Sequence, residues 1–364
     1  MRRRGDSAPG SEAEGSLFER PSPDSLKRFA ITLALSAGGG LLFTLLGMPA
    51  GWVSGGLLAV AVGSLAGIDT DVPVPVRAPV YLILGIYAGG GVSQETLHQM
   101  QTWPASFAIL GVSLVGLIAS SYWWLHGRCG WDRNAALLAS LPGALSFVMA
   151  AAEGLKADLK KVAIAQSLRL LILVETIPLI AILIGHPMSA PASAPAAPAS
   201  LRDVLILLAA SLVAALVLQR LRVAGGWMLG GLFASAGLLL SGAVETRLPF
   251  SLVLPFIVVL AGITGSRFRP GDLALLRHLL KPALVAFALA LGISMVSAGT
   301  VSLLFGVNII QTLLAFAPGA LDALIILAYQ MNIDPAYVAA HHVVRFMALV
   351  VAMPFLVRWL GRGA

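Results

Sequence analysis

Two arginines lie inside long apolar stretches of this 364-residue chain, where a charged side chain is costly. Arg169 and Arg345 each stand about two turns into a run that predicts a membrane helix. A central arginine costs roughly 2.5–3.5 kcal/mol on insertion scales, so both are expected to face the protein interior. There they could hold an anion, hold carboxylates that titrate, or close structural salt bridges.

Three further ionisable residues lie in the same stretches and are candidates for proton coupling. Asp322 is expected either to pair with Arg345 or to take up a coupling proton. Glu175 follows Arg169 by six positions, which places it on another face of the helix and toward another element. His341 shares a helix face with Arg345, either as a proton-sensitive neighbour or as a hydrogen-bonded packing residue.

A Pro-Gly-Ala sequence interrupts an apolar segment at two places, within residues 134–152 and 310–331. Proline removes a backbone donor and glycine loosens the turn, so each segment is expected to break near the bilayer midplane. The half-helix ends could bind a solute, or the breaks could simply shape packing. The predicted substrate-binding residues are Pro142, Gly143, Ala144, Ser146, Arg169, Pro318, Gly319, Ala320, Asp322 and Arg345.

These residues recur because the chain contains one unit twice. The sequence Pro142-Gly143-Ala144-Leu145 returns 176 positions later, and Arg169 returns as Arg345 at the same displacement. Gly85 matches Gly262 at a displacement of 177. A near-constant displacement in a strongly apolar chain indicates a membrane architecture of two repeats.

Composition sets the class of protein. Hydrophobic residues make up 58% of the chain and charged residues only 11%, against about 25% charged in soluble domains. With several runs near the 20 residues that span a bilayer, this predicts an all-α polytopic membrane protein. The predicted divisions are a disordered tail (1–26), a first repeat (27–186), an Ala/Pro linker (187–200) and a second repeat (201–364).

Loop charges predict the topology. If all twelve apolar segments crossed, the loop cations near 156–161 and 267–281 would lie outside, against the positive-inside bias. They lie inside if the two Pro-Gly-Ala segments are re-entrant and each half crosses five times. An odd number of crossings inverts the second repeat. We therefore expect two inverted repeats in a bacterial inner membrane, with both termini cytoplasmic.

Several classes of function lack support in the sequence. Histidines and carboxylates do not occur at metal-ligand spacing, and no phosphate-binding loop or nucleophile elbow is present. One cysteine excludes an intramolecular disulfide. We predict no enzymatic activity, no cofactor, no metal and no direct nucleic-acid binding.

The order of these motifs resembles the AbrB (AbrB duplication) family of bacterial membrane proteins. The resemblance covers the chain from about residue 28 and rests on Pro49-Ala50-Gly51-Trp52, on Gly226-Trp227, on both Pro-Gly-Ala blocks and on the two arginine helices. One departure is Ala224, which stands where Pro49 would predict a proline. The resemblance implies a regulator of gene expression, because members often carry that label.

Two functions therefore stand at this point. The fold favours a secondary-transporter-like carrier of a small solute, with an anion suggested by the arginines. The alternative is a membrane-embedded regulator that acts through a partner. In either case the lipid bilayer surrounds the protein, and a homo-oligomer is left open.

Overall fold

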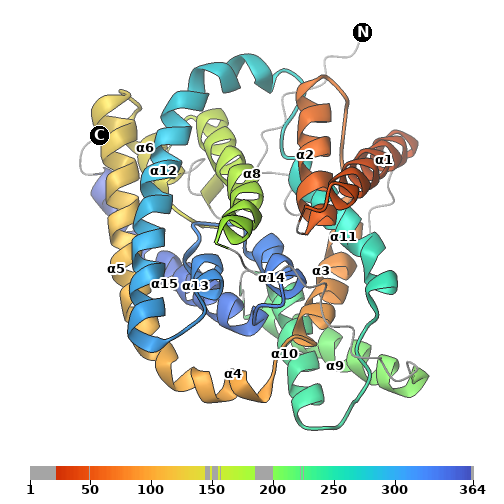
Figure 1. Cartoon of the computed structure of the whole chain (residues 1–364). Helices are drawn as coiled ribbons and strands as arrows, with labels where there is room; N and C mark the ends of the chain where they lie inside the picture. The colour runs from red at the N-terminus through yellow and green to blue at the C-terminus, as the bar shows by residue number, and fades with distance from the viewer. Residues whose placement is uncertain are drawn as a thin grey trace.

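The computed structural model describes residues 22–48, 50–143, 148–149, 155, 157–184, 200–221, 223 and 225–361, and its regular structure there is helical (Figure 1). The all-α prediction is confirmed. The predicted tail and linker lie mostly outside the described residues.

The helices of the first half are α1 (Pro23–Leu45), α2 (Gly51–Leu65), α3 (Val74–Gly89), α4 (Gln94–Gln99), α5 (Trp103–Tyr122), α6 (Arg133–Ser140) and α8 (Leu159–Leu183). Those of the second half are α9 (Leu201–Arg220), α10 (Gly226–Leu240), α11 (Phe250–Gly265), α12 (Asp272–Phe305), α13 (Ile309–Phe316), α14 (Leu321–Gln330) and α15 (Pro335–Gly361).

Six of these helices are long and apolar enough to cross a membrane: α1, α5 with its extension to Arg128, α8, α9, α12 and α15. Four other predicted crossings, α2, α3, α10 and α11, are apolar helices of 15 or 16 residues. They are shorter than the roughly 20 residues that span a bilayer without help. The chain is thus a polytopic helical membrane protein, while the total of ten crossings stays a prediction.

Two helices begin earlier than the sequence predicts. α1 starts within the predicted tail because the Ser22 side chain accepts a hydrogen bond from the Ser25 amide (3.2 Å) and caps the helix. α12 was expected from residue 282 and starts at Asp272, after Gly271 in the left-handed conformation (φ 96°). Arg277 and Lys281 therefore lie on a helix and not in a loop. In Figure 1 the first turns of α12 cross the end of the molecule before it descends beside α5, and Pro282 within the helix explains the bend.

The helices form two groups that lie side by side in Figure 1. In one group α2 packs on α1 and α11, while α10 packs on α9 and α3. In the other group α5 packs on α12, and α8 and α15 pack on the short helices α6 and α13. Each contact between two helices has a counterpart between the matching helices of the other half: α2 on α11 matches α10 on α3, and α8 on α6 matches α15 on α13. A pseudo-two-fold relation between the halves requires this.

The pair α5 and α12 fixes the orientation of that relation. The Trp124 indole donates to the Pro282 carbonyl (3.1 Å), and the Ser121 hydroxyl donates to the Ala286 carbonyl (3.2 Å). Numbers rise along one helix as they fall along the other, so the two helices are antiparallel. A two-fold axis that exchanges antiparallel spanning helices is perpendicular to them and lies in the membrane plane. The predicted inversion of the repeats is confirmed.

A π-helical turn explains why the displacement between repeats changes from 177 to 176. α5 continues as a π-helix over Trp123–Arg128, and the Cys129 amide donates to the Trp124 carbonyl, five residues back (3.0 Å). Such a turn holds one more residue than an α-helical turn. Residues of α5 before this turn therefore match α12 at 177, and residues after it match the second half at 176.

The broken segment of the second half enters and returns at one end of the molecule. Because α12 is antiparallel to α5, it ends where α5 begins. α15 begins there too, since Tyr337 and His341 contact Ser106 in the first turn of α5. The intervening helices α13 and α14 are therefore re-entrant, as predicted.

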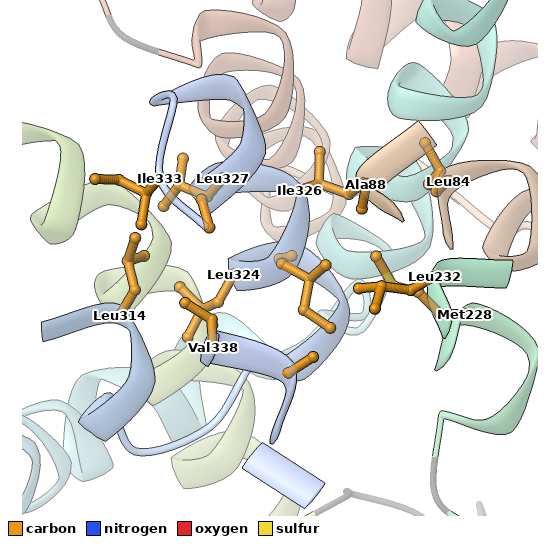
Figure 2. Close-up of a cluster of buried hydrophobic side chains, with 14 of the residues drawn as sticks. Leu84, Ala88, Met228, Leu232, Leu314, Leu324, Ile326, Leu327, Ile333 and Val338 are labelled. Carbon is orange, nitrogen blue, oxygen red and sulfur yellow. The ribbon is translucent and has the colours of Figure 1, made fainter. Parts of the chain in front are cut away.

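The returning helix α14 is enclosed by other elements on every side. Its residues from Ala323 to Ala328 are each at most 4% exposed. Figure 2 shows Leu324, Ile326 and Leu327 of α14 among apolar side chains of α3, α10, α13 and α15. A helix that is apolar all round belongs in such a core. Protein on every side also makes a broken backbone tolerable at membrane depth.

Candidate functional site

The second break runs from Ala317 to Ala320, between the end of α13 and the start of α14. Pro318 has no N–H, Gly319 adopts φ +136° and Ala320 adopts φ 57°. The left-handed conformation costs a residue with a side chain roughly 1–2 kcal/mol, so Ala320 is held there by its surroundings. The first break begins with Leu141 in extended conformation after α6. Pro142 and Gly143 follow, whereas Ala144 and Ser146 lie outside the described residues.

Gln166 and Arg169 of α8 fasten the first break. The Gln166 amide nitrogen donates to the carbonyls of Leu138 and Leu141, at 3.0 Å each. One guanidinium nitrogen of Arg169 donates to the Leu141 carbonyl (2.9 Å) and to the Gln166 amide oxygen (2.5 Å). A second donates to the Ala139 carbonyl (3.4 Å). The last carbonyls of a helix have no partner within it, and these side chains supply one.

His342 and Arg345 of α15 fasten the second break in the same way. Arg345 donates to the Ala317 carbonyl, and its other terminal nitrogen donates to His342 Nδ1 (2.8 Å). His342 Nδ1 is thus an acceptor, which assigns the ring proton to Nε2. That proton is donated to the Leu314 carbonyl (3.0 Å).

The two arrangements superimpose residue for residue on the displacement of 176. Gln166, Arg169, Leu138 and Leu141 become His342, Arg345, Leu314 and Ala317. We call each set a clamp: clamp 1 is Gln166 with Arg169, and clamp 2 is His342 with Arg345. In both, a cation lies at the carboxyl end of a half-helix, where the macrodipole favours positive charge.

Neither arginine of the clamps has an acidic partner among the described residues. Arg169 is 8% exposed and Arg345 is 4% exposed, and their hydrogen bonds go to carbonyls and to neutral side chains. Both approach the second break, since Arg345 donates to the Ala317 carbonyl and a Cβ atom on Gly319 would lie 3.7 Å from Nε of Arg169. Two like charges are therefore buried together with no counter-charge in the described part of the chain.

The two breaks also face each other. A Cβ atom on Gly319 would lie 3.7 Å from Nε of Arg169, which belongs to the other half. Reciprocally, a Cβ atom on Gly143 would lie 3.6 Å from Leu349 of α15. Each break is thus contacted by the long helix of the opposite repeat.

Asp322 does not pair with Arg345, contrary to one of our expectations. Arg345 already uses its terminal nitrogens on clamp 2. Asp322 instead lies in the first turn of α14 and faces the amino end of α10, where a Cβ atom on Gly225 would be 3.7 Å from its Oδ1. The Arg267 guanidinium is the opposite charge that acts on Asp322.

The other two proton-coupling candidates take no part in the hydrogen bonds of the clamps. His341 is fully buried, and its nitrogens contact the Ser106 hydroxyl (2.7 Å) and the Tyr337 carbonyl (2.8 Å). These contacts agree with a hydrogen-bonded packing residue, and a role in proton coupling stays a prediction. Glu175 is partly buried, and its Oε1 has no hydrogen-bond partner among the described residues.

Sequence reasoning missed Gln166 and His342. Both stand three residues before a repeat-matched arginine, one helical turn away. Both can donate with one atom and accept with another. Two side chains with this capacity at repeat-matched positions could have indicated that each is a hydrogen-bond partner of its arginine.

Comparison with known proteins places this arrangement in a family. The model of a family described as "Transition state regulatory protein AbrB" matches residues 52–361. The chain belongs to the AbrB family. It is 25% identical over 354 residues to the "Uncharacterized protein YhjN" of Bacillus subtilis (strain 168), which covers 90% of this chain and 92% of that protein. It is also 27% identical over 350 residues to the "Putative regulator AbrB" of Escherichia coli (strain K12), covering 92% of this chain and 95% of that protein.

The AbrB match includes both breaks and both clamps. It begins at Trp52, in the first turn of α2, and ends at Gly361, the last residue of α15. The resemblance drawn from the motifs is thereby confirmed at the level of the family. The clamps are the chemical feature that this AbrB-family chain places at its centre.

Proposed function

We propose that this AbrB-family protein is a membrane carrier of a small anionic solute, without enzymatic activity. One observation carries the proposal: two guanidinium groups are buried at facing breaks with no carboxylate partner in the described part of the chain. A buried charge without compensation is costly. An anion between the halves would supply the missing charge.

The inverted repeats give such a solute contacts with both halves. Arg169 is fastened to the first break but reaches the second at Gly319. A solute held there would touch elements of both repeats. Alternating access in inverted-repeat carriers moves one group of helices against the other around a central site. Both clamps lie in the group of α5, α6, α8, α12, α13 and α15, and we expect this group to move against the group of α1–α3 and α9–α11 (Figure 1).

Flux through proteoliposomes tests the proposal. Full-length protein would be reconstituted, and uptake of labelled chloride, phosphate, sulfate, acetate and succinate would be followed. We expect uptake of at least one anion, reduced at least tenfold by Arg169→Lys, which keeps the charge but loses the planar fork. Arg220→Lys is the matched control, because Arg220 is exposed at the end of α9. No uptake of any anion by folded protein would end the proposal.

We also propose that the protein lies in the bacterial inner membrane with both termini cytoplasmic. Ala274 is exposed on the first turns of α12, and Gln101 is exposed before α5. In a Cys129→Ser background, Ala274→Cys should react with an impermeant thiol reagent only from the cytoplasmic side. Gln101→Cys should react only from the opposite side. Labelling of both from one side would refute this topology.

Regulation of gene expression is the second candidate, and a name favours it: the Escherichia coli relative is called a "Putative regulator AbrB". A membrane-embedded regulator would act through a cytosolic protein. Crosslinking in intact cells should then recover one stoichiometric partner, and its loss should reproduce the expression change of a deletion strain. Flux without such a partner would decide for the carrier.

A further inference from the structure

The two clamps differ in the space beside their arginines. A cavity of about 20 Å³ borders Arg169, between α5, α6, α8 and α12. A water molecule needs roughly 10–15 Å³ of volume open to its centre, so this cavity holds one small particle. Its two polar lining residues are Arg169 and Ser121, which are 8% and 3% exposed. The Ser121 hydroxyl donates its proton to the Ala286 carbonyl (3.2 Å).

The cavity exists because the helices around Arg169 carry alanines. Ala165 of α8 lies one turn before Arg169, and Ala283, Ala286 and Ala290 approach from α12. None of these side chains can fill the space or bring a charge. The cavity therefore offers one cationic side chain, that of Arg169, in a wall that is apolar apart from Ser121.

In the other half the matching space is filled. Ala165 corresponds to His341, and Ala283 corresponds to Ser106 at the displacement of 177 that holds before the π-helical turn. His341 and Ser106 are hydrogen-bonded at 2.7 Å. The rings of Phe107 and Phe316 lie 4.7 Å and 5.7 Å from the His341 ring, between centroids. Arg345 thus has close-packed aromatic groups where Arg169 has a void.

We infer that the cavity beside Arg169 is a binding site for one compact monovalent anion of halide size. Within the part of the chain that the structure describes, Arg169 has no carboxylate to balance its charge, and the residues that line the cavity bring none. A cation would meet only repulsion there. The site deepens the proposed carrier function, on which its physiological role rests, by assigning the anion to one arginine of the two.

Halide binding to purified full-length protein tests the inference apart from transport. Thermal unfolding would be measured in sodium gluconate and in sodium bromide at constant ionic strength. We expect bromide to raise the unfolding temperature of the wild type in a saturable manner. Ala165→Val and Ala283→Val fill the cavity and leave the Arg169 side chain unchanged. Each should weaken the apparent bromide affinity at least tenfold.

Two controls keep the outcome decisive. Ala209→Val places the same β-branched residue at an exposed position of α9 and should leave the bromide effect unchanged. His341→Ala should open a space beside Arg345 and add a second saturable bromide step. A wild type that does not respond to bromide, or filled variants that respond as the wild type does, would overturn the site. Absence of flux with bromide binding intact would instead count against the carrier alone.

Discussion

Clamp 1 and clamp 2 perform the same structural task with different surroundings. Each gives the carbonyls at the end of a half-helix the donors they lack, through residues related by a displacement of 176. Clamp 1 borders a void among alanines, whereas clamp 2 is closed by His341 and two phenylalanine rings. The hydrogen bonds to the backbone are thus the shared requirement, and the space beside the arginine is where the halves have diverged.

The largest expected effect comes from removing an arginine of either clamp. Arg345→Ala leaves the carbonyl at the end of α13 without a donor in a close-packed site, so we expect a loss of about 3 kcal/mol. Arg169→Ala should cost about 1 kcal/mol less, because water can enter the cavity and satisfy the carbonyls. Unfolding in detergent, followed by tryptophan fluorescence, would measure both. Equal losses would contradict the difference in packing between the clamps.

A smaller effect is expected when the partner of the arginine is exchanged between halves. His342→Gln installs the residue of clamp 1 in clamp 2 and should cost at most about 1 kcal/mol. His342→Leu removes both hydrogen bonds and should cost about 2 kcal/mol, since a buried group is left unsatisfied. If glutamine were no better than leucine in unfolding experiments, His342 would be filling space and not positioning Arg345.

Removing a hydrogen bond beside clamp 2 should lower the free energy of unfolding by a smaller amount. Ser106→Ala removes the hydrogen bonds to His341 and to the Tyr337 hydroxyl (2.8 Å), and we expect a loss of about 1 kcal/mol. Ala283→Ser adds the matching hydroxyl beside clamp 1. There it finds no hydrogen-bond partner like the His341 ring, because Ala165 stands at the matching position. Its effect on unfolding should stay within about 0.5 kcal/mol. A larger cost for Ala283→Ser than for Ser106→Ala would reverse this ranking.

The smallest effect concerns a hydroxyl on the seam between α5 and α12. Ser113 is buried, and its oxygen has no hydrogen-bond partner among the described residues, whereas Ser121 donates to the Ala286 carbonyl. Ser113→Ala should therefore raise stability slightly, by about 0.5 kcal/mol, and Ser121→Ala should lower it by about 1 kcal/mol. Flux measured on the same samples shows whether the unpartnered hydroxyl is retained for function. A loss of stability in Ser113→Ala would mean that a partner is present.

The sequence predicts the architecture well because repetition and charge are long-range signals. The inversion, the breaks and the re-entrant second segment all follow from motif displacement and from the placement of cations. The start of α12 was misplaced, since a helix start depends on local features such as Gly271 and Asp272, and the cations Arg277 and Lys281 read as a loop.

The site was predictable in its residues but not in its contacts. Arg169 and Arg345 were identified from their cost in a bilayer, yet their partners are backbone carbonyls that no side-chain pattern reveals. The cavity depends on five alanines brought together from three helices. An alanine gives no signal of its own in one sequence, so only packing could show the void.

The exchange of neighbours between the halves bears on how the chain is assembled in the cell. α2 packs on α11 and α3 packs on α10. The helices that are synthesised first therefore wait for partners that leave the ribosome roughly 150 to 200 residues later. During synthesis the amino-terminal helices must remain in the bilayer with their close-packing glycine surfaces uncovered. Gly85 meets the α10 backbone so closely that no side chain would fit. Such glycines therefore decide whether the two halves can join after their helices have been inserted. A bulkier residue at such a position should leave the insertion of each helix intact but prevent the two halves from packing together. Membrane proteases should then degrade the protein.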